Sequence, residues 1–362
     1  MENMPKENNV KKSSNKNLHK AKNDKNDEFY TQYNDIQKEI QAYIDYNPDV
    51  FRGKTILLPC DDPEWSNFTK FFAQNFERFK LKKLISTSYA NESKGFNGDW
   101  KPTLFEVNNP RFDTTKTSKN GKIFILDHDT SNDGKIDIDD LEWNYLDGDG
   151  DFRSDEVKAL RDEADIIVTN PPFSLFREFL AWIVEADKQF VIIGNMNAIT
   201  YKEVFPLIKD NKIWLGISSG GKTYIKPDGK EQKMGNTCWF TNLDHGRRHQ
   251  PLPLMTMADN FKFSKHKEIR GKTSYEKYDN YYAIEVPFTD AIPNDYAGVM
   301  GVPISFLDKY SPEQFNIVGA TESEGKGFSN GLWEETSKVA QPMVNKKRIY
   351  KRIFIQHKKA VK

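Results

Sequence analysis

Cysteine is scarce in this sequence. Only Cys60 and Cys238 occur among 362 residues, and each lies inside a short apolar run. Two such residues cannot build a disulfide framework or a CxxC zinc site, and they suit a reducing cytoplasm. The sequence also lacks a signal-peptide pattern and an apolar run of about 20 residues, the length that a membrane span needs. We therefore expect a cytoplasmic protein that does not enter a membrane.

The chain also lacks net charge, because 53 Lys and Arg residues balance 53 Asp and Glu residues. The charge is unevenly distributed: residues 1–27 carry +3, residues 28–244 carry −9 and residues 245–362 carry +6. A basic C-terminal third beside an acidic middle is typical of an enzymatic core with a module that binds a polyanion. Ordinary variation in surface charge gives the same pattern, so this feature alone decides nothing.

Short apolar runs alternate with helical periodicity through most of the chain. Residues 1–27 are the exception, being rich in Lys, Asn and Ser, and we expect a disordered basic tail there. The alternation predicts an α/β fold with a doubly wound, mostly parallel sheet that binds ligands at the carboxyl ends of its strands. The expected helices are 36–44, 68–79 and 173–186, and the expected strands are 55–59, 84–88, 122–126, 164–168, 190–194, 213–216 and 237–241.

The alternation fades after about residue 244, where aromatic and basic residues become mixed. We therefore predict a catalytic domain over residues 28–244 and an α+β region over residues 245–362, part of which packs back on the core.

The most informative motif is the tetrapeptide Asn170, Pro171, Pro172 and Phe173, which directly follows an apolar strand. The exocyclic amine of adenine is a poor nucleophile, because its lone pair is delocalised into the ring. An Asn170 side-chain oxygen and a Pro171 carbonyl can accept hydrogen bonds from the two amine protons and free that lone pair. The two prolines fix the backbone, and Phe173 offers a flat face to an extruded base. The competing interpretation is a junction in which the prolines merely end the strand.

With this motif the chain resembles the amino-methyltransferases, and its flanking residues resemble those of the EcoRI modification methyltransferase family. The resemblance covers roughly residues 28–360. It rests on seven segments: Phe29–Ile36, Leu58–Pro63, Leu146–Phe152, Asn170–Glu178, Gly194–Asn195, Ala198–Tyr201 and Gly301–Ile304.

This resemblance implies a class I methyltransferase with a Rossmann-like fold and S-adenosylmethionine as the methyl donor. It further implies transfer to N6 of an adenine that is flipped out of a short palindromic duplex sequence with an AT-rich centre. The residues themselves do not specify that sequence. A companion restriction endonuclease that acts on the same sequence is compatible with the resemblance, and we expect a monomer.

The resemblance also implies which residues hold the cofactor. Tyr30 and Thr31 match a segment that closes over the methionine part, and Asn170 borders the same site. Related enzymes often have a glycine-rich turn after the first strand, whereas this sequence has none there. The remaining cofactor residues expected from the resemblance are Pro59, Cys60, Asp61 and Asp62 in that turn, and Asp151 and Phe152 at the cofactor adenine. The usual ribose-binding acid after the second strand is missing.

The basic C-terminal region is the expected DNA-recognition region, because cationic side chains can neutralise phosphates. The predicted DNA-binding residues are Arg247, Arg248, Lys262, Lys265, Lys267 and Lys272, and the run Lys346-Lys347-Arg348 could also neutralise phosphates. Two other functions stay open: an RNA or protein amino-methyltransferase that uses the same chemistry, and a catalytically inactive DNA-binding protein.

Two further motifs compete with this interpretation. Residues 129–140 fit the spacing of an EF-hand calcium loop, but the twelfth position is Asp140 and an expected strand precedes the loop. We therefore expect an acidic turn held by its own hydrogen bonds, and no metal. Pro59-Cys60 is compatible with the cysteine nucleophile of cytosine C5 methylation, but it follows the wrong strand for that role.

Overall fold

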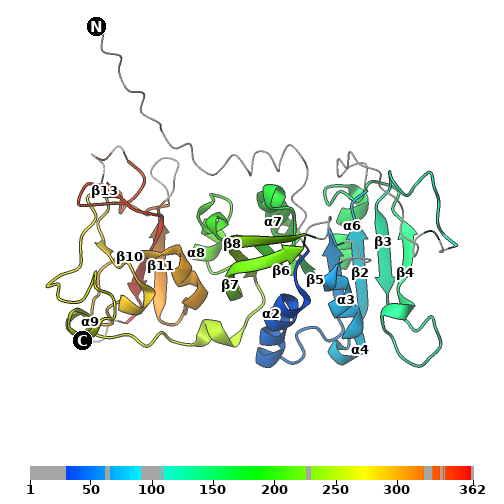
Figure 1. The fold of residues 1–362 in the computed structure, drawn as a ribbon, viewed down its shortest axis with the longest axis horizontal. Coiled ribbons are helices and arrows are strands. Elements are labelled where there is room, and N and C mark those ends of the chain that lie inside the picture. Colours follow the sequence, from blue (N-terminus) through cyan, green and yellow to red (C-terminus); the bar gives the residue numbers. More distant parts are fainter. Residues whose placement is uncertain are drawn as a thin grey trace, which may run out of the picture.

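The computed structural model describes residues 30–61, 66–90, 107, 110–225, 230–321, 328–334, 337 and 339–359. The predicted tail over residues 1–27 and the predicted cofactor residue Asp62 lie outside the described residues. Figure 1 shows two sheets side by side, a large one formed by the first two thirds of the chain and a small one formed by the last third.

The large sheet has eight strands in the order β4-β3-β2-β1-β5-β6-β8-β7. Its strands are β1 (Thr55–Pro59), β2 (Lys83–Ser88), β3 (Lys122–Leu126), β4 (Glu142–Tyr145), β5 (Ile166–Thr169), β6 (Gln189–Asn195), β7 (Trp214–Ile225) and β8 (Glu231–Thr241). The seven strands expected from the sequence are all present, and β4 is an additional one.

The sheet is mixed, and this corrects the expectation of a mostly parallel one. The four central strands β2, β1, β5 and β6 run parallel to one another. The edge strands β3 and β4 on one side, and β8 and β7 on the other, pair antiparallel. Only five residues separate β7 from β8, fewer than the crossover that parallel pairing of consecutive strands needs.

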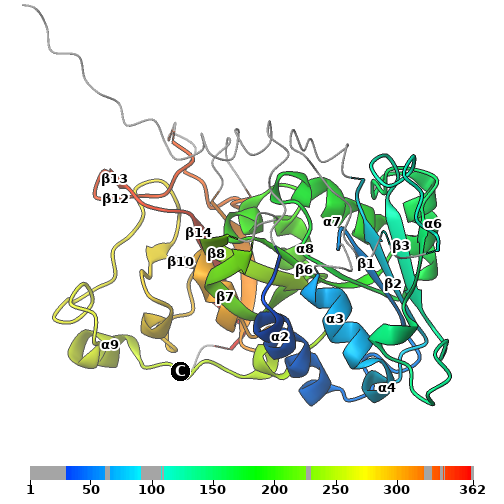
Figure 2. The ribbon, with the colours of Figure 1, turned by 45° about the vertical axis from the view of Figure 1, so that its right-hand side comes forward.

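Helices cover both faces of this sheet (Figures 1 and 2). One face packs on α2 (Tyr33–Tyr46), α3 (Asn67–Gln74) and α4 (Phe76–Phe79) through buried side chains such as Ile36, Phe72 and Leu58. The other face packs on α6 (Asp155–Glu163), α7 (Phe176–Glu185) and α8 (Phe205–Lys209). The α/β class expected from the alternating sequence pattern is therefore confirmed.

The small sheet has four strands in the order β11-β14-β10-β9. The C-terminal elements are α9 (Met257–Phe263), β9 (Ile284–Glu285), β10 (Met300–Pro303), β11 (Phe315–Ala320), β12 (Met343–Val344), β13 (Lys347–Arg348) and β14 (Arg352–His357). One continuous cluster of buried apolar side chains contains Ile167 and Phe240 of the large sheet together with Ile317 and Ile353 of the small one. The two sheets thus share a hydrophobic core.

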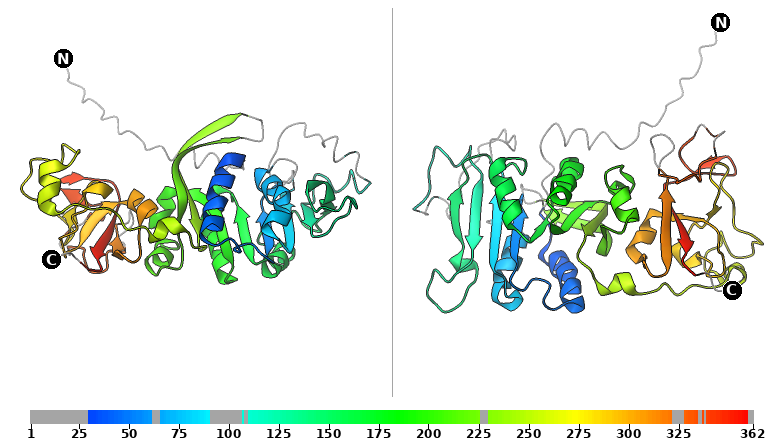
Figure 3. Two further views of the ribbon diagram at one scale, coloured as in Figure 1. Left: turned by 90° about the horizontal axis from the view of Figure 1, so that it is seen from below. Right: turned by 180° about the vertical axis from the view of Figure 1, so that it is seen from behind.

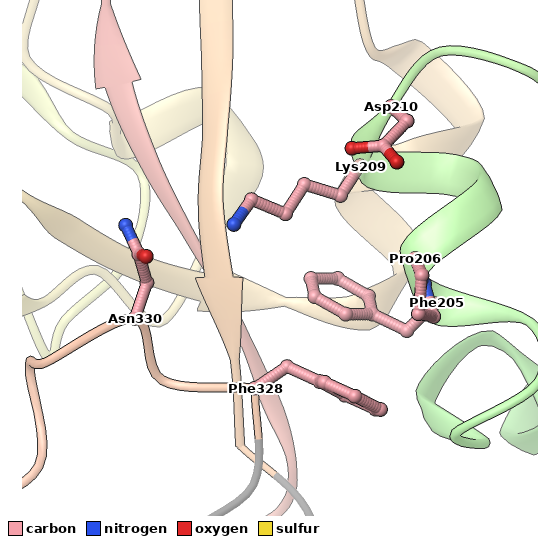
Figure 4. A pocket seen from close by; sticks show the side chains of 6 residues that line it. All are labelled: Phe205, Pro206, Lys209, Asp210, Phe328 and Asn330. Carbon is pink, nitrogen blue, oxygen red and sulfur yellow. The ribbon is translucent and has the colours of Figure 1, made fainter.

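A cavity of about 300 Å³ lies where α8 meets the small sheet (Figure 4). The rings of Phe205 and Phe328 stack at its wall with their centroids 5.3 Å apart. Its lining residues are Phe205, Pro206, Lys209, Asp210, Phe328 and Asn330. None of these is a residue that the sequence analysis assigned to catalysis, cofactor or DNA.

Among the helices that the structure describes, none is both long and apolar enough to cross a bilayer.

His249 connects the large sheet with the C-terminal region. Its ring nitrogens lie 2.9 Å from the Asp244 carboxylate and 2.8 Å from Glu313, and its ring stacks on Tyr46 at the end of α2. Burial alone lowers the pKa of His249, but the hydrogen bonds to Asp244 and Glu313 outweigh burial, so that the pKa is raised above its usual value.

We predict that this contact stabilises the fold mainly at mildly acidic pH. Because the folded-state pKa of His249 is raised, its stabilisation is fully present below the unfolded value of about 6.5 and is lost as the pH rises through the folded-state pKa. His249→Gln should therefore lower the free energy of unfolding more at pH 6 than at pH 9 in urea titrations. An equal loss at both pH values would contradict this role.

Candidate active site

The carboxyl ends of β1, β2, β5 and β6 lie on one edge of the large sheet, because these strands are parallel. Asp61, just after β1, forms hydrogen bonds that connect β1 with β2 and β5. Its buried carboxylate accepts a hydrogen bond from the Ser66 hydroxyl at 2.8 Å and lies 2.6 Å from the Thr169 hydroxyl at the end of β5. Its backbone N–H donates to the Thr87 carbonyl in β2 at 3.0 Å. The predicted cofactor turn and the predicted catalytic turn are thereby held together.

Cys60 forms the bend that carries the chain from β1 to Asp61. Its φ is +76°, in the left-handed region that residues with a side chain rarely adopt. A glycine-rich turn usually supplies such a conformation at no steric cost. In this sequence a cysteine adopts the left-handed conformation that a glycine would supply.

The catalytic turn connects β5 to α7 through a short 3₁₀ helix, η2 (Phe173–Leu175). Asn170 is partly buried and Pro171 is buried. The Pro172 carbonyl accepts a hydrogen bond from the Leu175 N–H at 2.9 Å. Within the described part of the chain, no group donates a hydrogen bond to the Pro171 carbonyl. The Pro171 carbonyl oxygen thus remains available as the hydrogen-bond acceptor that the predicted chemistry requires.

Gly194 lets α7 approach this edge. A Cβ atom at Gly194, near the end of β6, would overlap the ring of Phe176, the first residue of α7. Phe176 is buried in the core shared by the two sheets. The sequence contains the Gly194-Asn195 pair as part of the family resemblance, but only the packing shows why the glycine is needed.

Phe173 packs against the β7–β8 hairpin. Its ring meets the ring of Tyr224, in β7, edge to face, with centroids 6.5 Å apart and an interplanar angle of 89°. The next residue, Ile225, exchanges two backbone hydrogen bonds with Tyr30, at 2.8 and 3.0 Å. Figure 3 shows these two strands rising beyond the sheet on the side of α2. One hairpin therefore supports both the aromatic ring of the catalytic turn and the segment with Tyr30 and Thr31.

A buried carboxylate fixes the course of this hairpin. Glu39 of α2 accepts hydrogen bonds from the backbone N–H groups of Ile217 and Ser218, at 2.8 and 3.2 Å, and from the Tyr43 hydroxyl at 2.8 Å. Burial raises the pKa of Glu39, and these hydrogen bonds offset part of that effect. The contact coincides with a register shift between Leu215 and Ser219. The sequence pattern of an amphipathic helix did not single out this glutamate.

Two buried hydroxyl groups at this edge have no hydrogen-bond partner among the described residues. They belong to Thr31 and to Thr87, which lies near the carboxyl end of β2. The Thr31 carbonyl accepts from the Asn67 side chain at 2.8 Å, so the backbone around Thr31 is fixed beside Ser66 and Asp61. A buried polar atom without a partner is costly, and such atoms often face a ligand. Thr87 was not among the predicted residues, since a hydroxyl inside a strand carries little sequence signal.

Asp151 and Phe152 lie next to the end of β2. Gly150, with φ of +83°, packs on the Ser88 carbonyl, where a Cβ atom would not fit. Burial raises the pKa of Asp151, but hydrogen bonds from Arg153 outweigh it and the pKa is lowered overall. The Phe152 ring is buried beside Phe179 and Trp182. Their contact with the cofactor adenine stays a prediction.

The acidic loop over residues 129–140 is held by its own backbone, as expected. The Asp129 carboxylate accepts from Asn132 N–H at 2.6 Å and from Gly134 N–H at 2.8 Å. Asp140 accepts from the N–H groups of Thr130, Ser131 and Asp137, and these bonds lower its pKa to about 2. The preceding element is strand β3, in place of the entering helix of an EF-hand.

The predicted DNA-binding residues do not form one surface. Arg248 is buried, stacks on Trp214 and pairs with Asp244 at 3.5 Å. Arg247 donates to the Ile217 carbonyl. Lys262 and Lys267 are exposed, as is Lys265, which pairs with Asp290 at 2.7 Å, and Lys272 pairs with Glu276 at 2.9 Å. Their contact with DNA stays a prediction.

Comparison with known proteins places this chain in a family. The family described as adenine-specific methyltransferase EcoRI matches residues 17–358. The chain belongs to this family. The sequence-based prediction of an adenine-specific methyltransferase is thereby confirmed.

The EcoRI-family chain is similar to three Type II methyltransferases over most of its length. It is 42% identical to M.EcoRI of Escherichia coli, over 98% of this chain and 100% of that protein. It is 33% identical to M.MpnI of Mycoplasma pneumoniae, over 83% and 84% of the two chains. It is 32% identical to M.MgeORF184P of Mycoplasma genitalium, over 94% and 98%. No solved structure matches this family member.

We predict that Cys60 serves this methyltransferase through its backbone conformation and not through its thiol. Cys60→Gly removes left-handed strain of about 1 kcal/mol and should leave methyl transfer and the melting temperature close to wild type. Cys60→Val puts a branched side chain on the same backbone and should lower the melting temperature by several degrees. Both variants are measured by thermal unfolding and methyl transfer. Complete inactivity of a stably folded Cys60→Gly enzyme would instead indicate a nucleophilic thiol.

Proposed function

We propose that this chain transfers a methyl group from S-adenosylmethionine to N6 of an adenine flipped out of duplex DNA, at a short palindromic sequence with an AT-rich centre. The observation that carries the proposal is the contact between Asp61 and Thr169, which holds the cofactor turn directly beside Asn170–Phe173. Family membership and the Type II methyltransferases among its relatives support the same substrate.

The catalytic turn supplies hydrogen-bond acceptors in a fixed geometry. The Asn170 side-chain oxygen and the Pro171 carbonyl accept the two protons of the adenine amine, so that its nitrogen lone pair is released from the ring. Acceptors that are already in place need no reorganisation during the reaction. The Phe173 ring, supported edge-on by Tyr224, stacks on the flipped base.

The cofactor site consists of residues from four elements along the sheet edge. S-adenosylmethionine, when bound, supplies a sulfonium methyl group that the adenine amine attacks. Thr31 and Tyr30 bind its carboxylate, the Pro59–Asp62 turn and Asn170 border its methionine part, and Asp151 with Phe152 takes its adenine. The partnerless Thr31 and Thr87 hydroxyls and the left-handed Cys60 turn fit such a ligand. Thr87 lies near the end of β2, where related enzymes have a ribose-binding acid, and its hydroxyl binds a hydroxyl group of the ligand.

The proposed function also implies a division of the chain into two regions. Residues 28–244 form a doubly wound, Rossmann-like class I catalytic domain, supported by the parallel centre of the sheet and the helices on both faces. Residues 245–362 form an α+β target-recognition region that shares the core of the catalytic domain. The enzyme acts as a cytoplasmic monomer, and a restriction endonuclease for the same sequence is its functional companion.

The function is tested by incubating the protein with methyl-labelled S-adenosylmethionine and unmethylated plasmid DNA, followed by separation of the digested nucleosides. Label in N6-methyladenine is the expected result. Label confined to RNA or protein added in parallel would keep the chemistry of Asn170 and overturn the DNA assignment. No label in any of the three would overturn the enzymatic function.

Asn170→Ala should reduce methyl transfer by about 100-fold or more, because one of the two acceptors of the adenine amine is lost. Calorimetric titration should show that S-adenosylmethionine affinity changes only a few-fold. Asn144→Ala, at an exposed position of β4, is the matched control and should retain wild-type activity. A fully active Asn170→Ala enzyme would contradict the proposed mechanism.

Thr31→Val and Thr87→Val should separate ligand binding from stability. Valine has nearly the shape of threonine, and removing a buried hydroxyl without a partner costs the fold little. Each variant should keep or raise the melting temperature while S-adenosylmethionine affinity falls by about 3- to 10-fold, the value of one hydrogen bond. Unchanged affinity in both variants would remove these hydroxyls from the cofactor site.

A further inference from the structure

We propose that the β12–β13 hairpin, with the exposed residues Asn345 to Arg348, is the element that contacts duplex DNA beside the active site. The proposal rests on the DNA methylation proposed above and adds the surface that holds the duplex. The sequence analysis counted Lys346, Lys347 and Arg348 only among the basic residues that could neutralise phosphates. It placed the DNA contacts on six other residues, among them Lys262, Lys265 and Lys267 in and after α9.

The hairpin has a tight and well-defined turn. Val344 pairs with Lys347, and the two residues between them, Asn345 and Lys346, have φ of +50° and +63°. Two successive left-handed residues are the signature of a type I′ turn, which matches the twist of an antiparallel ribbon. The turn therefore presents its side chains in one orientation.

Side chains from a neighbouring segment brace this turn. The Lys346 N–H donates to the Asp279 carboxylate at 2.6 Å, and the Met343 N–H donates to the buried Asn280 side chain at 2.9 Å. The Asn345 side chain donates to Glu276 at 3.3 Å. Two carboxylates and one amide thus hold the hairpin through its backbone and through Asn345.

The cationic groups of the hairpin are available to a partner. Lys346, Lys347 and Arg348 are exposed, and none of them forms an ion pair with a residue that the structure describes. This differs from the predicted DNA-binding residues Lys265, Lys272 and Arg248, each of which already pairs with a carboxylate. Three exposed cations without an ion-pair partner among the described residues, all on one braced hairpin, form a site for a polyanion.

The hairpin lies on the same side of the molecule as the candidate active site. After β13 the chain contacts η3 (Met196–Thr200), which directly follows β6. The Tyr350 hydroxyl donates to the Asn197 side chain, and the Lys351 ammonium group donates to the Thr200 hydroxyl at 2.7 Å. The neighbouring strand, β5, leads into Asn170. Figures 1 and 3 show β12–β13 towards this edge of the molecule and α9 at the opposite end of the C-terminal region.

The partner that fits this surface is B-form DNA. A two-stranded β-ribbon is narrow enough to enter the major groove, while its cations reach the phosphates on either side. In this proposal, the duplex held by the hairpin also extends to the Asn170 turn, so that binding and base flipping take place on one face.

The test compares DNA binding by wild type and by a triple variant, Lys346→Gln, Lys347→Gln and Arg348→Gln. The ligand is a labelled, unmethylated duplex that contains a site methylated by the wild-type enzyme in the plasmid. Binding is measured by fluorescence anisotropy over a series of salt concentrations. Loss of three phosphate contacts should weaken binding by about 10-fold or more and reduce the slope of log affinity against log salt by about 2 to 3. S-adenosylmethionine affinity and melting temperature should stay at wild-type values, which shows that the variant is folded.

A second triple variant, Lys309→Gln, Lys358→Gln and Lys359→Gln, removes the same charge from exposed positions away from the hairpin and should bind DNA nearly as wild type does. Equal losses in both triple variants would reduce the effect to net charge and overturn the proposal, and so would wild-type binding by the hairpin variant.

A third variant, Lys262→Gln, Lys265→Gln and Lys267→Gln, tests the surface after α9. If only this variant loses affinity and salt dependence, the hairpin proposal is overturned while the DNA substrate stands. If wild type itself does not bind the duplex, the proposed function fails, and the role of the hairpin fails with it.

Discussion

The carboxylate of Asp61 is the contact on which the candidate active site depends. It is buried where β1, β2 and β5 end, and hydroxyl groups from Ser66 and Thr169 both reach it. A buried carboxylate without hydrogen bonds would be costly, so the position of each of these elements is coupled to the others. The left-handed Cys60 delivers Asp61 to this point, and the Asn170 turn begins one residue after Thr169.

A second constraint acts from the other side of the site. The buried Glu39 fixes β7 at its register shift, and the far part of that strand then brings Tyr224 to Phe173 and Ile225 to Tyr30. The β7–β8 hairpin is thus more than an edge of the sheet. It carries the rigidity of the core to two segments that the proposed function assigns to the flipped base and to the methyl donor.

The sequence predicted the centre of the molecule better than its edges. The apolar runs of β1, β5 and β6 and the Asn170–Phe173 turn were identified correctly, because buried parallel strands and prolines leave strong local signals. Strand β4 and the outer part of β7 and β8 lack apolar runs, so their antiparallel pairing was missed. The burial of Arg248 against Trp214, the left-handed Cys60 and the partnerless Thr87 hydroxyl depend on residues distant in sequence. No local pattern could have predicted these three features.

The hydrophobic core shared by the two sheets also constrains how a substrate enters. Residues such as Ile167 and Ile353 belong to one uninterrupted apolar cluster, so swinging the sheets apart would expose it at a cost of about 25 cal/mol per Å². This shared core therefore opposes a clamp-like opening of the two sheets around the double helix. The duplex must adapt to a nearly rigid platform, and the work of distorting it falls on its own stacking and bending stiffness. DNA sequences whose base pairs unstack at a low energetic cost are then bound in preference, before any base-specific contact forms.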